Sequence, residues 1–421
     1  MSALRGRALA CFFLLVPYLL IPRPVSAAQS AWVATWSASP EAADPDPDEP
    51  LLKIENQTVR ERMRISQGGA QIRVRFSNEF GSTPLLVGSA TVAEPGDPSS
   101  VKPGSIRQIT FGGLPSVTIP PGAPVLSDPV AFPAAAGSEI SISLYFPKRV
   151  ATPTLHGLAL KRGVVSPQGD FTRAEKIAGG TGTESLILIS EVLVPAQPDQ
   201  RLVVAFGDSI TDGDRSTVDA DRNWPSDLVR RLEKMPGGPK LAVVNAGIAG
   251  NRLLEDGPLA GLGVNALARF DRDALAQPGV THIVLLEGVN DIGFPGAKLG
   301  ALLLADAGDV RTKEELIGAY RQLIARAHAH GIKVIGGTIT PFEGVVLAGY
   351  YSEAKEALRQ AVNQWIRTSG AFDGVIDFDA ILRDPEHLGR LLARFASEDH
   401  LHPNDAGYQA IADAIDLHLF Q

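Results

Sequence analysis

The stretch that decides the fold is Leu202-Val203-Val204-Ala205-Phe206-Gly207-Asp208-Ser209, near the middle of the chain. Its apolar residues follow one another without alternation, which is typical of a strand buried on both faces of a sheet. A glycine after such a strand permits a tight turn, so the chain can enter a helix directly. We therefore predict a strand–turn–helix unit with Ser209 at the carboxyl end of a buried strand.

Four similar apolar runs follow, separated by stretches with helical spacing. The runs occupy residues 241–244, 283–286, 333–335 and 375–378. Buried strands that alternate with helices predict a parallel sheet covered on both faces, which is an α/β fold. Apolar spacing predicts one of the helices over residues 313–330. A last helix is expected to begin near Asn404, a favourable cap, and to bury Ile411, Ile415 and Leu419.

The first half of the chain has a different pattern of apolar and polar residues. Residues 70–76 and 139–146 alternate apolar and polar side chains, which is the signature of half-buried strands. Turn-rich segments separate such runs, and residues 31–194 show no long helical periodicity. This half is predicted to be an antiparallel β-sandwich, jelly-roll-like in its architecture.

The change of texture falls at Pro195-Ala196-Gln197-Pro198 and predicts the domain organisation. A chain of 421 residues exceeds the usual size of a single hydrophobic core, so two domains are expected. We predict a signal peptide over residues 1–28, a β-sandwich accessory domain over 29–197 and an α/β domain over 198–421.

The first residues follow the order of a secretory signal peptide. Arg5 and Arg7 precede an apolar run over residues 8–21, and small residues follow at 25–28. An uncleaved membrane anchor is the weaker alternative, because the run is short and Pro17 interrupts it. The pattern predicts a secreted or periplasmic protein with no stable membrane insertion after cleavage.

The charge and the cysteine content indicate which classes of partner and of chemistry are not expected. The chain has 39 Lys and Arg against 47 Asp and Glu, a net charge of −8, and no basic stripe. Nucleic acid is therefore not expected as a partner. The single cysteine, Cys11, would leave with the signal peptide, so the mature protein is expected to use neither disulfides nor thiol chemistry.

Residues able to do chemistry follow the predicted strands, where open α/β sheets form their sites. Gly207-Asp208-Ser209 alone is an ordinary turn sequence. Asn245-Ala246-Gly247-Ile248-Ala249-Gly250-Asn251 and Gly288-Val289-Asn290-Asp291 follow the next two runs. Near the end, Asp399 lies three residues before His402, a spacing at which a carboxylate can orient an imidazole and leave its other nitrogen free to take a proton.

These four motifs, in this order, resemble the four blocks of the SGNH (GDSL) hydrolase family, over roughly residues 200–421. The resemblance implies a flavodoxin-like sheet of five parallel strands. The β-rich first half is similar in texture to a segment that precedes the hydrolase domain in some secreted bacterial members, near the carbohydrate-esterase branches.

The resemblance also implies roles. Ser209 would be the nucleophile, His402 its base and Asp399 the group that orients His402. The oxyanion hole would consist of Gly250, Asn290 and the backbone N–H of Ser209. No cofactor or metal is implied. An Asp399-His400-Leu401-His402 run has metal-ligand residue types, but no distant set of ligands completes it.

The expected function is an exported serine esterase that cleaves acylated carbohydrate or small carboxylic esters, so its partner is a small-molecule or polysaccharide ester. One alternative is an O-acyltransferase that uses the same residues, and another is a lipase or lysophospholipase specificity. A glycan-binding module is a further alternative, although few aromatic residues lie in the β-rich half. Residues 294–309 and 342–351 could shape the substrate pocket or pack on the β-rich domain.

Overall fold

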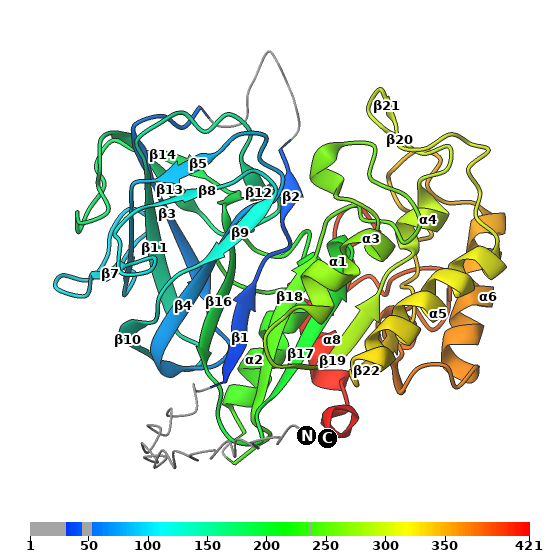
Figure 1. Ribbon diagram of the computed structural model, residues 1–421. Helices are drawn as coiled ribbons and strands as arrows, with labels where there is room; N and C mark the ends of the chain where they lie inside the picture. Colours follow the sequence, from blue (N-terminus) through cyan, green and yellow to red (C-terminus); the bar gives the residue numbers. More distant parts are fainter. Residues whose placement is uncertain (1–30, 44–52, 236) are drawn as a thin grey trace, which may run out of the picture. The chain divides into compact units, whose positions relative to one another are not determined.

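The computed structural model describes residues 31–43, 53–235 and 237–421. The predicted signal peptide and Cys11 lie outside the described residues. Two parts are distinguished below: the β-rich part, residues 31–195, and the α/β part, residues 201–421. Figure 1 shows the two parts side by side.

The α/β part is built on one parallel sheet. Its spatial order is β18–β17–β19–β22–β23, and every neighbouring pair is parallel. This is the flavodoxin-like order 2-1-3-4-5, with the switch point between the first and third strands of the sheet. The bounds are β17 Arg201–Gly207, β18 Leu241–Gly247, β19 Val280–Leu286, β22 Lys333–Gly337 and β23 Gly374–Ile376. The predicted sheet is confirmed.

One strand boundary was wrong. The run 375–378 was expected to be strand throughout, yet β23 ends at Ile376 and helix α7 (Phe378–Leu382) begins at Phe378. The reason is local, because the Asp377 side chain accepts a hydrogen bond from the Ala380 N–H and caps the helix.

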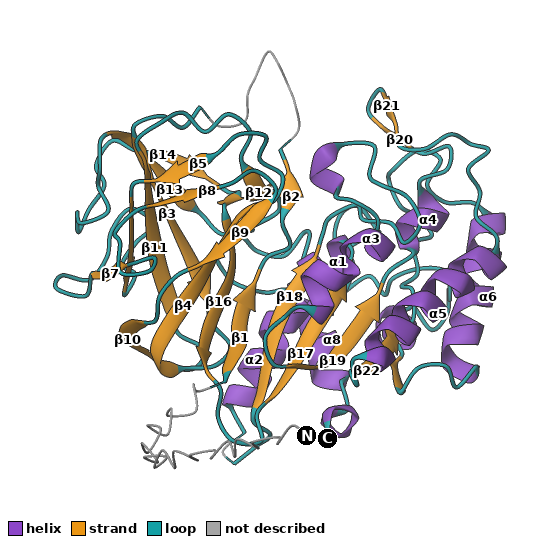
Figure 2. Ribbon diagram, in the orientation of Figure 1, coloured by secondary structure: helices purple, strands orange, loops and turns teal. Residues whose placement is uncertain are grey.

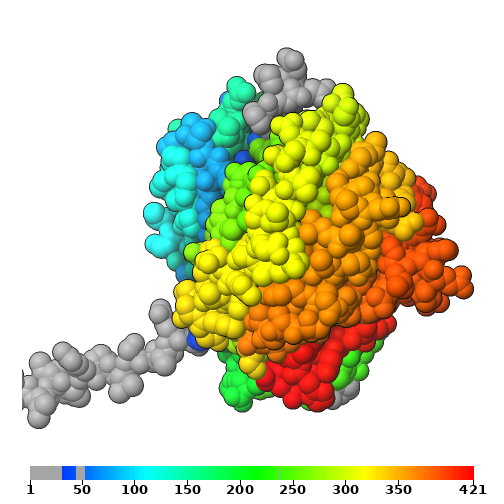
Figure 3. Space-filling view, turned by 90° about the vertical axis from the view of Figure 1, so that its right-hand side faces the viewer, coloured from blue at the N-terminus to red at the C-terminus, as the bar shows by residue number. Residues whose placement is uncertain are grey.

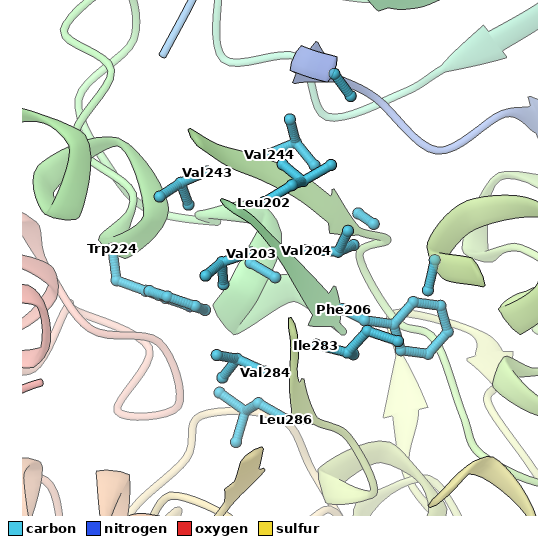
Figure 4. Close-up of a cluster of buried hydrophobic side chains, with 14 of the residues drawn as sticks. Leu202, Val203, Val204, Phe206, Trp224, Val243, Val244, Ile283, Val284 and Leu286 are labelled. Carbon is cyan, nitrogen blue, oxygen red and sulfur yellow. The ribbon is translucent and has the colours of Figure 1, made fainter. Parts of the chain in front are cut away.

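Helices cover both faces of this sheet (Figure 2). In Figure 4, Trp224 points toward Val203 on one side of the strands, while Phe206 lies on the other side. Phe206 packs edge-on against Phe270 of α3, at a centroid distance of 5.2 Å. The remaining helical segments of the described part are α1 Ser209–Asp212, α2 Trp224–Glu233, α3 Ala266–Phe270, a π-helical turn Asp271–Leu275, α4 Val289–Gly293, α5 Lys313–Ala329, α6 Glu353–Thr368, α8 Asp405–Ala414 and 3₁₀ turns at Ala260–Leu262 and Leu417–Phe420.

Two helices test the predicted boundaries. Helix α5 matches the expected span of 313–330 and begins at a capping box formed by Thr312 and Glu315. Helix α8 begins after its cap Asn404, as expected. It ends earlier than expected, at Ala414, because Ile415 adopts an extended backbone before a separate 3₁₀ turn. Figure 3 shows the face to which α5, α6 and the C-terminal residues contribute.

Among the described residues of the β-rich part every strand pair is antiparallel, which confirms the predicted antiparallel β-sheet domain. One sheet has the order β1–β16–β4–β10 with β9 on β4, and a second has the order β14–β13–β3–β11–β6–β7. The strands expected at 70–76 and 139–146 are β4 (Gly69–Asn78) and β11 (Glu139–Phe146). The others are β1 Trp32–Ser37, β2 Glu41–Ala42, β3 Gln57–Arg64, β5 Leu85–Val87, β6 Ser89–Ala93, β7 Arg107–Ile109, β8 Val117–Ile119, β9 Ala123–Leu126, β10 Val130–Ala134, β12 Thr154–His156, β13 Gly163–Gln168, β14 Thr181–Thr183, β15 Leu186–Ile187 and β16 Ile189–Pro195.

The β-rich part covers the free edge of the parallel sheet. Strand β18 is the edge strand, and the N–H of Val243 in it donates to Ser66 Oγ at 3.2 Å. Gln67 Nε2 donates to the carbonyl of Leu241, also in β18, at 3.0 Å. Covering an edge in this way prevents it from pairing with other chains. Both parts belong to one compact unit, residues 31–421, so the domain boundary at 197/198 stays a prediction.

Within the described part of the chain, no helix has the length and apolar character needed to cross a membrane.

Candidate active site

Ser209 is held at the start of a one-turn helix. It is the first residue of α1, directly after β17, and the Asp208 side chain caps this helix by accepting from the Ile210 N–H at 2.9 Å. A Cβ at Gly207 would collide with the side chain of Thr211, so the turn requires glycine there. Because Ser209 lies in the first turn, its backbone N–H has no acceptor within the helix.

The structure brings Ser209, His402 and Asp399 together. Ser209 Oγ lies 2.8 Å from His402 Nε2, and His402 Nδ1 lies 2.8 Å from Asp399 Oδ2. His402 is almost fully buried, at 8 % exposure. Both distances are those of good hydrogen bonds, so a proton can pass from the serine to the imidazole while the carboxylate holds the ring.

Asp399 is held by its own loop, between α7 and α8. Its Oδ1 accepts hydrogen bonds from Ser397 Oγ, the Leu401 N–H and the His402 N–H. Burial alone would raise the pKa of Asp399, but the hydrogen bond and charge of His402 and these backbone donors hold that pKa well below its usual range. Asp399 therefore stays ionised at neutral pH.

The oxyanion-hole candidates also meet at this edge of the sheet. Asn290 lies in the first turn of α4, and its Nδ2 donates to the carbonyl of Asn251, the neighbour of Gly250, at 2.9 Å. An amide has two N–H bonds, so this contact uses one and leaves the second. Gly250 has φ +74°, and a Cβ there would lie 2.7 Å from the Leu262 side chain, so only glycine suits this loop.

The sequence model of the GDSL-like Lipase/Acylhydrolase family matches residues 205–410. These residues form a GDSL-like lipase/acylhydrolase domain. All the residues of the predicted site lie within the matched segment. The domain is accordingly a carboxylic ester hydrolase, and the family resemblance found in the four motifs is confirmed.

Solved structures give a looser likeness. An aryl esterase from M. smegmatis is 14 % identical, with coverage of 51 % of this chain and 95 % of that chain and a TM-score of 0.39. A lipase/acylhydrolase from Enterococcus faecalis is 20 % identical, with coverage of 51 % and 92 % and a TM-score of 0.36. A carbohydrate acetylesterase from Sinorhizobium meliloti is 14 % identical, with coverage of 51 % and 96 % and a TM-score of 0.37. No curated protein matches the sequence.

Two charged residues of the GDSL-like domain contact Asp399 and His402 and were missed by the sequence analysis. Arg215 Nε lies 2.9 Å from Asp399 Oδ2, the same oxygen that contacts His402. Asp214 Oδ2 lies 3.6 Å from His402 Nε2. Both follow helix α1, and Arg215 has φ 67°. Their closeness to the first motif was the only sequence signal, and charged loop residues are usually solvated.

Tyr350 belongs to the loop 342–351, which could shape the substrate pocket or pack on the β-rich domain, and the structure buries its side chain inside the GDSL-like domain. Its hydroxyl donates to Asn290 Oδ1 at 2.8 Å, so it fixes which way the Asn290 amide faces. Burial raises the pKa of Tyr350 well above its usual value, so it remains a neutral donor. Its ring packs edge-on against Phe294 and Phe342, each from one of the two proposed pocket loops.

These two loops, residues 294–309 and 342–351, pack against each other. Lys298 N–H donates to the carbonyl of Ala348 at 3.0 Å. Lys355 Nζ donates to three carbonyl oxygens, those of Gly293, Pro295 and Gly349. The loops therefore form one support around α4 and Asn290.

Arg269 of α3 joins the strand ends next to the Ser209 loop. It is buried and donates to the carbonyls of Gly207 and Ala246, each at 2.8 Å. It also donates to Asn251 Oδ1 at 2.8 Å and to Glu287 Oε1 at 3.1 Å. One side chain thus ties the ends of β17 and β18 to the loop of Gly250. Sequence analysis missed it because helical arginines usually face solvent.

Arg269 also pairs with the buried Asp273 at 3.2 Å, and three further buried carboxyl groups belong to the loops at these strand ends. Burial raises the pKa of Asp208 to about 7 and that of Asp291 to about 6, and it raises the pKa of Glu287 well above its usual value. Asp291 accepts hydrogen bonds from the N–H groups of Leu253 and Leu254, at 2.7 and 3.1 Å. These carboxyl groups bind backbone and arginine atoms of the GDSL-like domain, so their role is to hold the loops.

The possible metal run at 399–402 does not gather ligands. His400 is exposed, with φ 58°. Over the ranges 31–43, 53–235 and 237–421, no group of three or more His, Cys, Asp or Glu side chains is arranged to hold a metal ion.

Proposed function

We propose that the GDSL-like domain cleaves its ester through an acyl-enzyme on Ser209, with His402 as base and Asp399 as the orienting carboxylate. The observation that carries this proposal is the continuous chain from Ser209 Oγ through the His402 ring to Asp399, with 2.8 Å at each contact.

The acylation step follows from this geometry. Ser209 Oγ attacks the ester carbonyl carbon while His402 Nε2 takes its proton. The carbonyl oxygen gains negative charge and accepts hydrogen bonds from the Ser209 N–H, the Gly250 N–H and the free Asn290 N–H. A fixed donor of this kind contributes about 3 kcal/mol to the stability of the transition state. The intermediate then collapses, and the leaving alkoxide takes the proton from His402.

Deacylation reverses the roles. His402 takes a proton from water, the oxygen attacks the acyl carbon, and the bond to Ser209 Oγ breaks as His402 returns the proton to the serine. The products are the free acid and the restored hydroxyl. An alcohol in place of water gives acyl transfer, so adding an acceptor alcohol and measuring transferred ester against free acid separates esterase from O-acyltransferase.

The test of the nucleophile compares wild type with Ser209→Ala on short-chain aryl esters. We expect kcat to fall by about 10⁴-fold or more, because removing a catalytic serine leaves only binding and oxyanion stabilisation. A fluorophosphonate should add to the wild-type protein at Ser209, as measured by mass spectrometry of the peptides. Equal turnover by both proteins would refute the proposal. Thr217→Ala is the control for removing a nearby hydroxyl from a residue exposed to solvent.

The proposed substrate is an acylated carbohydrate or a small carboxylic ester. A second candidate is a longer, lipid-like ester, and exposed apolar side chains favour it. Leu299, Leu303 and Val346 are 54 %, 40 % and 67 % exposed, and all three lie in the two loops beside Asn290. The Val346 N–H donates to the carbonyl of Asp399, which places that loop next to the triad. Acetylated xylan, aryl acetates, longer acyl esters and lysophospholipids, assayed in parallel, distinguish the two.

We further propose that residues 1–28 direct export and are removed. The supporting pattern is a positive start, an apolar run and small residues at 25–28. Amino-terminal sequencing of the protein recovered outside the cytoplasm should begin at or close to Gln29. Recovery of the exported protein with residues 1–28 still attached would contradict the proposal.

A further inference from the structure

A buried histidine outside the triad connects the β-rich part to the helix that carries Ser209. His156, the last residue of β12, lies with Nδ1 3.0 Å from Glu41 Oε1 and Nε2 3.0 Å from Asp212 Oδ1. Its Nδ1 is also 3.1 Å from the carbonyl of Ser39. The side chains of His156, Glu41 and Asp212 are 6 %, 1 % and 5 % exposed.

His156 can satisfy both carboxylates only as an imidazolium. Burial alone would lower the pKa of His156, but the charges and hydrogen bonds of Asp212 and Glu41 raise that pKa well above its usual value. A neutral imidazole has one N–H, whereas the protonated ring has two and can donate to both partners. The three side chains therefore form a chain of charged hydrogen bonds that connects β2, through β12, to α1.

Asp212 is the other end of the nucleophile helix. Helix α1 runs from Ser209 to Asp212, a single turn, and one isolated turn is too short to be stable by itself. The backbone carbonyl of Asp212 accepts from Asn245 Nδ2 at 3.2 Å, and the Asn245 carbonyl accepts from Ser37 Oγ of β1 at 2.7 Å. Asn223 Nδ2 donates to the same Asp212 carbonyl at 3.2 Å. The backbone of Asp212 is thus held by the α/β part, with Ser37 of the β-rich part supporting Asn245. The side chain of Asp212, in contrast, is bound directly by His156 of the β-rich part.

We propose that His156 is a positioning residue for Ser209, so that the β-rich part completes the active site of the GDSL-like domain. The inference rests on Ser209 being the nucleophile. By binding Asp212 at the far end of α1, His156 determines the position of Ser209 Oγ relative to His402. A displacement of about 1 Å at a reacting atom can cost about a hundredfold in rate, so this support is expected to act on kcat more than on binding.

The chain offers a matched control beside the same contact. A cavity of about 90 Å³ has His156, Asp212, Lys161 and Asp221 among its lining residues. Lys161 is as buried as His156, at 5 % side-chain exposure, and pairs with Glu139 and Asp221 at 2.6 and 2.8 Å. It therefore links the two parts, as His156 does, but none of its ion-pair partners belongs to α1.

The experiment uses the full chain with four variants: His156→Ala, His156→Gln, Lys161→Met and Ser209→Ala. Each is assayed for kcat and KM on a soluble aryl ester, for the rate of inactivation by a fluorophosphonate, and for thermal unfolding. We expect His156→Ala to lower kcat and the inactivation rate by about tenfold or more, with KM within about twofold. His156→Gln, which can still donate to Asp212, should recover part of both rates, and Lys161→Met should keep them near wild type.

The readouts separate the possible failures. Wild-type rates in a folded His156→Ala, or equal losses in His156→Ala and Lys161→Met, overturn the positioning role. If His156→Ala does not fold, His156→Gln and Lys161→Met decide in its place, because only the former changes the support of α1. Wild-type turnover by Ser209→Ala would instead refute the proposed function, regardless of the results with the other variants.

Discussion

Asn290 illustrates how the neighbours of a single side chain fix the direction in which it faces. Its amide could face either way, but the Asn251 carbonyl accepts from its nitrogen and the Tyr350 hydroxyl donates to its oxygen. Together these contacts leave one N–H of the amide with a fixed direction. Preorganised donors stabilise a transition state because they need no reorientation during the reaction.

At this scale we predict that Tyr350→Phe lowers kcat by about tenfold to a hundredfold, with a smaller change in KM. The ring and its packing are retained, so only the hydroxyl that orients Asn290 is lost. Steady-state kinetics on a short aryl ester measures this effect. Tyr351→Phe, which removes a hydroxyl one residue along the same loop, is the control and should retain the wild-type kcat. A Tyr350→Phe enzyme with unchanged kcat would show that Asn290 does not depend on this bond.

At the scale of elements, local chemistry sets where the elements begin and end. Helix α5 begins at Thr312 because this side chain accepts from the Glu315 N–H while Glu315 accepts from the Thr312 N–H. Strand β3 differs from this helix start, because it buries a carboxyl group that is only partly hydrogen-bonded. One carboxyl oxygen of Glu61 is unpaired, and the other accepts from the Ile187 N–H. A cap stabilises its element, whereas a buried carboxyl group makes stability depend on pH.

For the helix, we predict that Thr312→Ala lowers the free energy of unfolding by about 1 kcal/mol, because one side of the capping box is lost. Thr312→Ser keeps the hydroxyl and serves as the control, with a change of only a few tenths of a kcal/mol. Denaturant unfolding measures both variants. Equal stabilities of the Ala and Ser variants would mean that the hydroxyl does not matter.

For the strand, burial raises the pKa of Glu61 from the ordinary 4.5 to about 8. Between these values the folded protein holds a proton that the unfolded chain releases, so this group makes the unfolding free energy fall as pH rises. Glu61→Gln removes that dependence. The stability of the variant relative to wild type should therefore rise by up to about 3 kcal/mol from about pH 5 to about pH 8.

Urea unfolding at several pH values measures the Glu61 effect. The matched control is Glu55→Gln, which replaces an exposed glutamate just before the same strand. Its stability relative to wild type should stay constant over this range. A constant difference for Glu61→Gln as well would mean that Glu61 is not protonated in the folded protein.

At the scale of the whole molecule, the β-rich part and the GDSL-like domain are joined by specific polar contacts. Residues Ser66 and Gln67 cover the edge strand β18, while His156 holds Asp212 on the nucleophile helix. Removal of the β-rich part would expose an edge strand and take from Asp212 the histidine that it binds. Both changes destabilise a fold.

We therefore predict that residues 198–421, produced alone, unfold at a lower temperature than the full chain and turn over aryl esters at least about tenfold more slowly. Circular dichroism melting and steady-state kinetics measure the two effects. The full chain carrying Lys161→Met, which keeps both parts, is the reference for the loss of one inter-part ion pair. Equal melting temperature and activity of the isolated segment would establish it as an independent domain.

Much of this protein could be predicted from its sequence, because the decisive signals are local. The non-alternating run at 202–206 indicated a buried parallel strand, and the motifs at Ser209 and Asn290 each follow such a strand. The Asp399–His402 motif lies instead just before helix α8 and its cap Asn404. The exceptions, the end of β23 at Ile376 and the end of α8 at Ala414, arose where a cap or an extended residue stops an apolar pattern.

Only the tertiary structure decided how the site is supported. Tyr350 lies 60 residues from Asn290, and His156 lies 56 residues from Asp212. Hydrophobic periodicity describes which face of an element is buried, but not which distant side chain meets it there. Such pairs form because the folding of other elements brings them together, and their hydrogen bonds satisfy polar groups that burial would otherwise leave unpaired.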